Sequence, residues 1–124
     1  LARRHDTRVW SSSSLPFTPG ILDAVEQVPD VVIGQVFGAM GTAPAGDSLI
    51  WYGVHAFEML QRVMGTGALR ARAVEDDSGV VATVDYGDGR RGLVEAVRGM
   101  WHYGGRVQSR KALVQFRCDM TYGY

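Results

Sequence analysis

The second half of the chain is a series of short β-rich runs separated by turn residues, and this pattern limits the fold more than any other feature. The runs are residues 69–75, 80–86, 92–98, 106–109 and 112–118. Asp76-Asp77-Ser78-Gly79 joins the first pair, and Gly87-Asp88-Gly89 joins the second, where Asp-Gly suits a tight turn with positive φ. Strands joined by such short turns pair antiparallel, because a parallel pair needs a long crossover connection.

The first half is expected to add two helices and one strand. Thr18, as an N-cap followed by proline, predicts a helix over residues 19–28. A strand is expected over residues 30–40. The longest helix is predicted over residues 47–64, because Asp47 is a good cap and a glycine-rich stretch follows the last turn.

Together these elements predict an α+β domain, in which an open, mostly antiparallel sheet carries helices on one face. The opposite face must be covered or stay polar. Its outward candidates are Arg70, Arg72, Thr83 and Asp85, mixed with Val and Leu, so a partner subunit on that face is expected. Residues 1–10 are interpreted as the tail of a helix running into a short strand, Thr7–Trp10, which belongs to a preceding unit.

The composition excludes several classes of function. Thirteen Lys and Arg balance thirteen Asp and Glu, so no net charge draws the chain to nucleic acid or to an anionic membrane. No apolar run approaches the roughly 20 residues needed to cross a bilayer. The three histidines and one cysteine show no metal-ligand spacing. Cys118 alone gives no sign of an oxidising compartment and is interpreted as a packed strand residue, so we expect a cytoplasmic protein.

The helix expected over residues 47–64 has an apolar side and a polar stripe. The apolar side of the helical wheel consists of Ile50, Gly53, Val54, Phe57, Leu60 and Met64. The opposite stripe consists of Ser48, Trp51, His55, Glu58 and Arg62. His55 therefore lies one turn from both Glu58 and Trp51. In such an arrangement the histidine can move a proton, the carboxylate can orient it, and the indole can offer a flat platform to a ligand.

A simpler interpretation of this stripe stays open. It would be the solvated face of an amphipathic helix, with Glu58 and Arg62 as an ordinary i, i+4 pair. Trp51 counts mildly against it, since a tryptophan is uncommon on a purely solvated face. Elsewhere, His102 follows Trp101 in a glycine-rich corner and could either reach a ligand or pack locally. We expect no dinucleotide-binding turn in this chain.

The run Trp51-Tyr52-Gly53-Val54-His55-Ala56-Phe57-Glu58-Met59-Leu60 resembles a helix of the glucose–fructose oxidoreductase / inositol dehydrogenase (Gfo/Idh/MocA) family. In that family a Gly-x-His-x-x-Asp/Glu pattern projects a histidine toward the substrate. The flanking segments agree in order. Residues 11–17 resemble the segment that leaves the nucleotide-binding domain, 31–40 the first strand of the C-terminal domain, 80–97 its hairpin, and 122–124 the start of a following helix. The resemblance covers about residues 8–124.

The resemblance implies one part of a two-domain enzyme. Residues 1–10 would be the tail of a nucleotide-binding domain, and residues 11–124 a substrate-binding and oligomerisation domain that is truncated at its C-terminal end. The family holds NAD or NADP in a Rossmann domain, where a Glu-Lys-Pro motif supplies a catalytic lysine. It transfers a hydride between the nicotinamide and a carbon that bears a hydroxyl or carbonyl group. No cofactor is expected on this chain alone, and a homo-oligomer through the sheet is expected.

The resemblance also assigns roles to residues. His55 matches the histidine that contacts the substrate and assists proton transfer, and substrate contacts are predicted at Trp51, Glu58, Trp101 and His102. The substrate would be a sugar, a polyol or a related hydroxy or keto compound.

Two positions depart from the family pattern. Many members carry an Asp where this chain has Trp51, and a basic residue where it has Pro16. Both changes remove polar contacts, so a bulkier or more apolar substrate that stacks on Trp51 is a hypothesis that fits them. The alternative function is a non-enzymatic α+β module that binds a ligand or assembles through its sheet.

Overall fold

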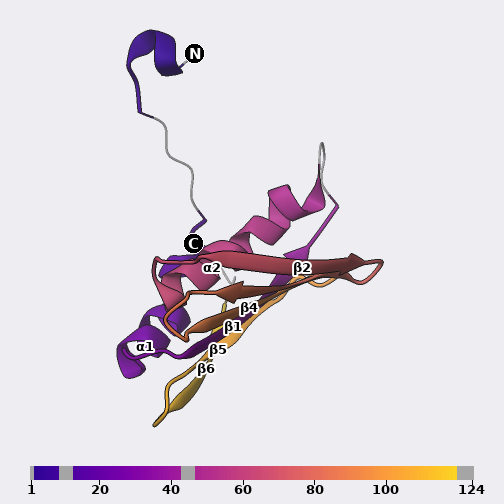
Figure 1. Cartoon of the computed structure of the whole chain (residues 1–124). Coiled ribbons are helices and arrows are strands. Elements are labelled where there is room, and N and C mark those ends of the chain that lie inside the picture. The colour runs from indigo at the N-terminus through magenta and orange to yellow at the C-terminus, as the bar shows by residue number, and fades with distance from the viewer. Residues whose placement is uncertain (1, 9–12, 43–46, 120–124) are drawn as a thin grey trace.

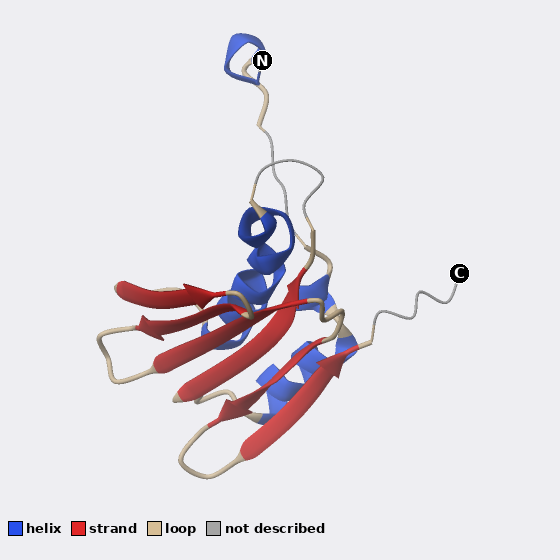
Figure 2. Cartoon of the chain, turned by 90° about the vertical axis from the view of Figure 1, so that its right-hand side faces the viewer, coloured by secondary structure: helices blue, strands red, loops and turns tan. Residues whose placement is uncertain are grey.

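The structure, a computed structural model, describes residues 2–8, 13–42 and 47–119. It contains one open six-stranded sheet with its helices packed on a single face (Figures 1 and 2). The elements in chain order are η1 (Ala2–His5), η2 (Leu15–Phe17), α1 (Pro19–Gln27), β1 (Ile33–Met40), η3 (Leu49–Gly53), α2 (Val54–Met64), β2 (Arg70–Asp76), β3 (Gly79–Asp85), β4 (Arg91–Arg98), β5 (Tyr103–Gln108) and β6 (Leu113–Cys118). The predicted fold class is confirmed.

The strands lie in the order β2-β3-β4-β1-β5-β6. Four of the neighbouring pairs are antiparallel, and three of these, β2 with β3, β3 with β4 and β5 with β6, are joined by short turns as predicted. The fifth pair, β1 with β4, is parallel, with Val36 opposite Val94. Since β1 lies between β4 and β5, the connection from β4 to β5 must pass the end of β1. This connection carries Trp101 and His102.

The core lies between the sheet and the two helices. α2 packs on β1 and β4, and α1 packs mainly on β6. The sheet contributes fully buried valines from three central strands, Val36, Val94 and Val107. Ile21 of α1 and Met59 of α2 are also fully buried. Burial of such side chains is the main favourable contribution to folding, at about 1.5–3 kcal/mol for each.

The buried face of α2 differs from the predicted apolar side. Ile50 and Val54 were assigned to that side, but their exposed fractions are 74% and 37%. The buried residues are Gly53, Ala56, Met59, Leu60, Val63 and Met64. The buried stripe thus lies further round the helix than predicted. Apolar residues flank it on one side as well, so hydrophobic spacing alone did not locate its centre.

Of the two helix caps predicted from the sequence, Asp47 and Thr18, only Asp47 makes a capping hydrogen bond. Asp47 accepts a hydrogen bond from the backbone N–H of Leu49 at 2.6 Å, as expected of a cap. Thr18 occupies the N-cap position of α1, but its side chain makes no capping bond. Its hydroxyl instead donates to the carbonyl oxygen of Leu15 at 2.9 Å, because the tight turn η2 brings that carbonyl close.

The N-terminal prediction is met only in part. Ala2–His5 forms a short 3-10 turn, and neither Thr7 nor Arg8 lies in a strand, so the predicted strand Thr7–Trp10 does not form in its described half. Val9 and Trp10 lie outside the described residues. Residues 122–124, which resemble the start of a following helix, lie outside the described residues as well.

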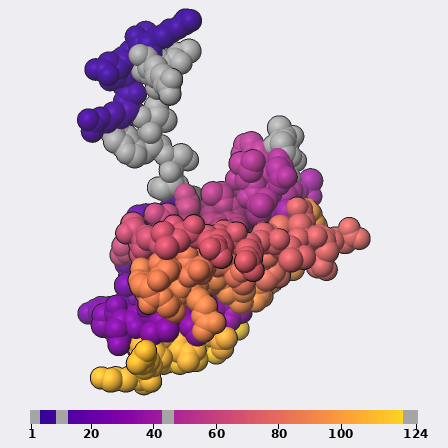
Figure 3. Space-filling view, viewed as in Figure 1, coloured from indigo at the N-terminus to yellow at the C-terminus, as the bar shows by residue number. Residues whose placement is uncertain are grey.

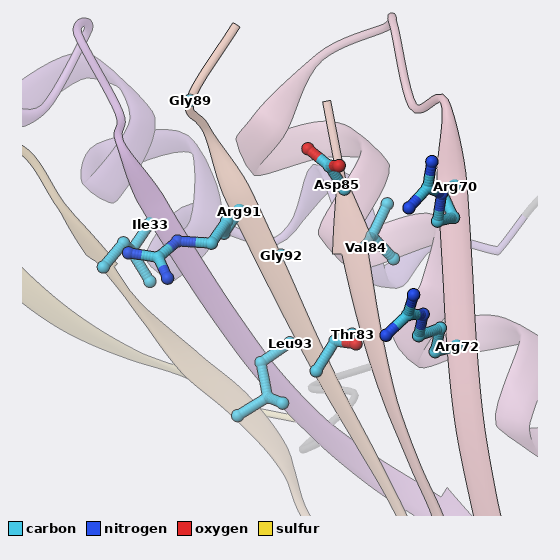
Figure 4. Close-up of a pocket in the computed structure, with 10 residues that line it drawn as sticks. All are labelled: Ile33, Arg70, Arg72, Thr83, Val84, Asp85, Gly89, Arg91, Gly92 and Leu93. Carbon is cyan, nitrogen blue, oxygen red and sulfur yellow. The ribbon is translucent and has the colours of Figure 1, made fainter. Parts of the chain in front are cut away.

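The face of the sheet opposite the helices carries the side chains that were predicted to point outward. Arg70, Arg72, Thr83 and Asp85 all lie there and line a shallow hollow, together with Arg91 (Figure 4). β2 is an edge strand, and every one of its residues is exposed. In the space-filling view, the β2–β3 hairpin forms a continuous strip along the surface (Figure 3). We call the face of the sheet opposite the helices the open face.

Candidate active site

The candidate site begins at a wide helical turn. Residues Leu49–Gly53 form a π-helical turn directly before α2, and the N–H of Val54 donates to the carbonyl oxygen of Leu49. A Cβ added at Gly53 would lie 2.6 Å from Leu49 Cδ1, so the leucine side chain would have to shift to admit a larger residue here. Single π turns inside α-helices occur frequently at functional sites. His55 follows immediately, in the first turn of α2.

His55 and Glu58 face each other on α2. The distance between His55 Nδ1 and Glu58 Oε2 is 3.9 Å, which is too long for a hydrogen bond. The side chains are 33% and 28% exposed. Nδ1 itself is buried and has no hydrogen-bond partner. The exposed part of the imidazole therefore lies away from Nδ1.

The segment that precedes α1 contacts two residues of the polar stripe, Glu58 and Arg62. The backbone N–H of Ser13 donates to Glu58 Oε2 at 2.9 Å. One helical turn later, the Arg62 guanidinium lies over the ring of Phe17, 5.8 Å from its centroid. The ion pairs among the described residues include none between Glu58 and Arg62. The i, i+4 pair of the simpler interpretation is therefore not formed, although Trp51 and Arg62 are exposed as a solvated face requires.

Tyr103 is a further residue of the site that the sequence did not single out. Its ring stands edge-on to that of His55, with 6.2 Å between the ring centroids. Tyr103 is the first residue of β5, on the helix side of the sheet, and only 4% of it is exposed. Burial raises the pKa of its hydroxyl above the usual range, so it stays protonated. In β5, Val107 faces inward between the outward-facing Arg106 and Gln108, and this alternation was a signal for the inward position of Tyr103.

The three remaining predicted residues do not contact the pair of His55 and Glu58. The ring of Trp101 stands edge-on to that of Tyr52, with 5.5 Å between the centroids. His102 is exposed and lines a hollow of about 770 Å³ that also includes Phe37 and Arg117.

Neither His55 nor Glu58 lines this hollow, although Tyr103 does. Tyr103 thus lies between the two groups of residues. Trp51 is 50% exposed, and no described ring contact involves it. The structure therefore brings His55 and Glu58 together, whereas the contacts described for Trp101 and His102 involve neither of them.

The residues described here do not fit a dinucleotide. The sequence does contain the spacing Gly-x-Gly-x-x-Gly, at residues 87–92, although we expected no such turn. In the structure this run is the turn between β3 and β4, and it leads into a strand. A dinucleotide site needs the run to open a helix, whose N-terminal N–H groups hold the pyrophosphate. Gly87 and Gly89 serve the hairpin instead, with φ of 73° and 91°.

Two further features are absent from the described part of the chain. No group of three or more His, Cys, Asp or Glu residues is arranged there to hold a metal ion. None of the helices in those residues combines the length and the apolar character needed to span a membrane.

Comparison with known proteins places the fold. No protein-family model and no curated protein matches the sequence. The structure is similar to GenD2 from gentamicin A biosynthesis, solved in complex with NAD, with a TM-score of 0.73 and 19% identity, over 99% of this chain and 43% of that one. It is also similar to a dehydrogenase from Chromobacterium violaceum, with a TM-score of 0.78 and 13% identity, over 94% of this chain and 40% of that one.

The chain therefore spans less than half the length of either structure. At these identities the likeness establishes the fold, which is an open α+β sheet domain of a kind found within an NAD-complexed protein and within a dehydrogenase.

Proposed function

We propose that this chain is the substrate-binding part of an NAD(P)-dependent oxidoreductase, which acts on a sugar, a polyol or a related hydroxy or keto compound. The observation that carries the proposal is the His55 imidazole, whose Nδ1 is buried beside the Glu58 carboxylate while another part of the ring is exposed. The shared fold with an NAD-complexed protein and a second dehydrogenase supports it.

The cofactor would be held by another unit, since the described residues do not form a dinucleotide site. A nicotinamide, when bound there, supplies or accepts the hydride. The role of this chain is to bind the substrate and to move the proton. His55 Nε2 would accept the proton of the substrate hydroxyl during oxidation and return it during reduction. A positioned general base of this kind typically contributes 10²–10⁴-fold to the rate.

The aromatic residues around His55 define the kind of substrate. Trp51 and Trp101 are 50% and 55% exposed, so each offers an indole surface to a ligand. Stacking on these faces favours a bulky substrate, or one with an apolar face, over a small and fully hydroxylated one. Glu58 and His102 would supply polar contacts.

The test is NAD(P)-dependent turnover by the protein as its native cell makes it, with a panel of sugars, polyols and their keto forms. Replacement of His55 by Ala should lower kcat by roughly 10²–10⁴-fold. His5→Ala is the matched control, since His5 lies in η1 and is exposed. Absence of turnover with every compound, or a His55→Ala enzyme with normal kcat, would contradict the proposal.

A second function, assembly with another copy through the open face, is favoured by a separate observation. Apolar side chains are exposed on that face, with Val74 74%, Val81 49% and Leu113 49% accessible. Charges of both signs lie among them, including Arg91 and Asp85 (Figure 4). A surface that carries both signs can pair with itself about a two-fold axis. We propose that this face holds a homo-oligomer together.

A further inference from the structure

We propose that Glu58 is a positioning residue for His55, and that the backbone N–H of Ser13 holds Glu58 in place. The segment of residues 13–17 would then be part of the site and would determine which imidazole nitrogen is free to take a proton. This inference rests on the proposed role of His55 and adds two residues to it.

The arrangement depends on a single carboxylate oxygen, Oε2 of Glu58. Glu58 Oε2 accepts the Ser13 N–H at 2.9 Å, and the same oxygen lies 3.9 Å from His55 Nδ1. A movement of about 1 Å between these last two atoms would make an ordinary hydrogen bond. The bond to Ser13 is formed already, so the N–H fixes the oxygen at the position from which it can serve His55.

The surroundings of Nδ1 favour a proton on this nitrogen. The atom is buried and has no other partner, and a carboxylate oxygen can accept a hydrogen bond but cannot donate one. From β5, Tyr103 presents its ring edge-on to the imidazole, at 6.2 Å between centroids. The neutral imidazole of His55 should therefore carry its proton on Nδ1. Nε2 then keeps its lone pair, which is the state that a general base requires.

The Ser13 segment is held against α2 at more than one point. The Ser13 hydroxyl accepts the N–H of Leu15 at 3.1 Å, and Leu15 is only 5% exposed in the core. Phe17 lies under the guanidinium of Arg62, one turn beyond Glu58. A displacement of this segment would therefore be transmitted to the carboxylate and from there to His55.

The experiment measures the protonated nitrogen directly, by ¹⁵N NMR of the imidazole rings in the full chain. At about pH 8.5, well above the ordinary histidine pKa of about 6.5, the ring is neutral and the nitrogen shifts report which tautomer is present. His55 is assigned by its loss in a His55→Gln variant. His5 and His102 give internal reference signals in every spectrum.

Two pairs of variants separate the two parts of the proposal. Glu58→Leu removes the carboxylate, and Glu58→Gln removes its charge only. Each should shift His55 toward the Nε2–H tautomer, by roughly tenfold for Leu, the ratio expected from one hydrogen bond to a charged group. Ser13→Pro removes the backbone N–H and should shift the tautomer equilibrium of His55 in the same direction. Ser13→Ala keeps the N–H and should leave His55 unchanged.

Each outcome decides something. A His55 tautomer that is unchanged in Glu58→Gln and Glu58→Leu would overturn the role of Glu58. A shift in the Glu58 variants but none in Ser13→Pro would overturn the role of Ser13. Well-dispersed amide spectra and unmoved His5 and His102 signals show that a variant is folded, and Glu58→Gln keeps the test possible if the Leu variant is not. Turnover is not measured here, so failure of the oxidoreductase proposal would be seen separately, with His55→Ala.

Discussion

Gly38 lies directly beneath the ring of Tyr103, and a Cβ at position 38 would lie 2.8 Å from both Cδ1 and Cε1 of that ring. The same Cβ would lie 3.1 Å from the Cβ of Ala56 on α2. The absence of a side chain at position 38 therefore allows β1, β5 and α2 to approach each other beside His55. This close approach places the Tyr103 ring against the imidazole.

Gly38→Ala should destabilise the protein, because neither the rigid tyrosine ring nor the helix can move away easily. We expect the free energy of unfolding to fall by roughly 1–3 kcal/mol, as for other overpacked cores. Urea unfolding measures it. Gly34→Ala is the matched control in the same strand, since its new Cβ would meet the flexible Met64 side chain at 2.6 Å and Val63 Cγ2 at 3.2 Å, and no aromatic ring. An equal or smaller loss in Gly38→Ala than in Gly34→Ala would show that this contact is not tight.

Arg90 should stabilise the C-terminal end of α2. Its guanidinium donates to the carbonyl oxygen of Met64, the last residue of α2, and at 3.3 Å to that of Thr66 in the loop that follows. A helix leaves its last carbonyl groups without backbone partners. We expect Arg90→Ala to lower the free energy of unfolding by about 1–2 kcal/mol. The free energy of unfolding of Arg90→Lys should lie between those of Arg90→Ala and the parent protein, because lysine keeps the charge but cannot donate through a planar fork.

Arg110→Ala serves as the control for Arg90, as Arg110 is exposed in the turn between β5 and β6. Equal unfolding free energies for Arg90→Ala and Arg110→Ala would mean that the helix end does not depend on the guanidinium.

The protein should lose stability as the solution becomes alkaline. Burial raises the pKa of the Cys118 thiol above 9.0, and those of the Tyr86 and Tyr103 hydroxyls above 10.0. Above about pH 9 the unfolded chain therefore binds fewer protons than the folded one. The free energy of unfolding then decreases as pH rises. The contribution of these groups is fully present below pH 9 and is lost as pH passes through the raised values.

Urea unfolding at intervals from neutral pH to about pH 10.5 measures this loss, since the ordinary pKa values of Cys and Tyr lie within that range. Cys118→Ala should be less stable at neutral pH because it leaves a small cavity, but its stability should fall less steeply near pH 9. A profile that is flat to pH 10.5 in the parent protein would contradict the assignment.

Local features of the sequence predicted the elements well. The Asp-Gly turn and the alternation of β3 and β4 define a hairpin through interactions between near neighbours, and the structure has it. The helix faces and the open face followed from periodicity, apart from the shift at Ile50 and Val54. His55 and Glu58 were paired correctly because residues three apart on a helix must lie on one side.

Contacts between distant segments could not be predicted from the sequence. The parallel pairing of β1 with β4 joins strands that have a helix and two other strands between them, and no local pattern specifies it. Ser13 reaches Glu58 across 45 positions through a backbone N–H, a group that every residue except proline has. Tyr103 reaches His55 only because β5 lies beside β1. The site was thus predicted along its helix and not across the sheet.

The open face should hold two copies of the chain together, and a charge placed in it should separate them. Val81 lies opposite Val74 on one side and Glu95 on the other, and it is 49% exposed. An arginine there would have to be desolvated in any paired state, at a cost of several kcal/mol. Val81→Arg should therefore convert an oligomer to a smaller species in light scattering coupled to size-exclusion chromatography. Gln61→Arg adds the same charge at an exposed position of α2 and should not change the mass of the oligomer. A parent protein that is monomeric at high concentration would contradict the proposed oligomer, and a Val81→Arg variant of unchanged mass would place the oligomer contact elsewhere.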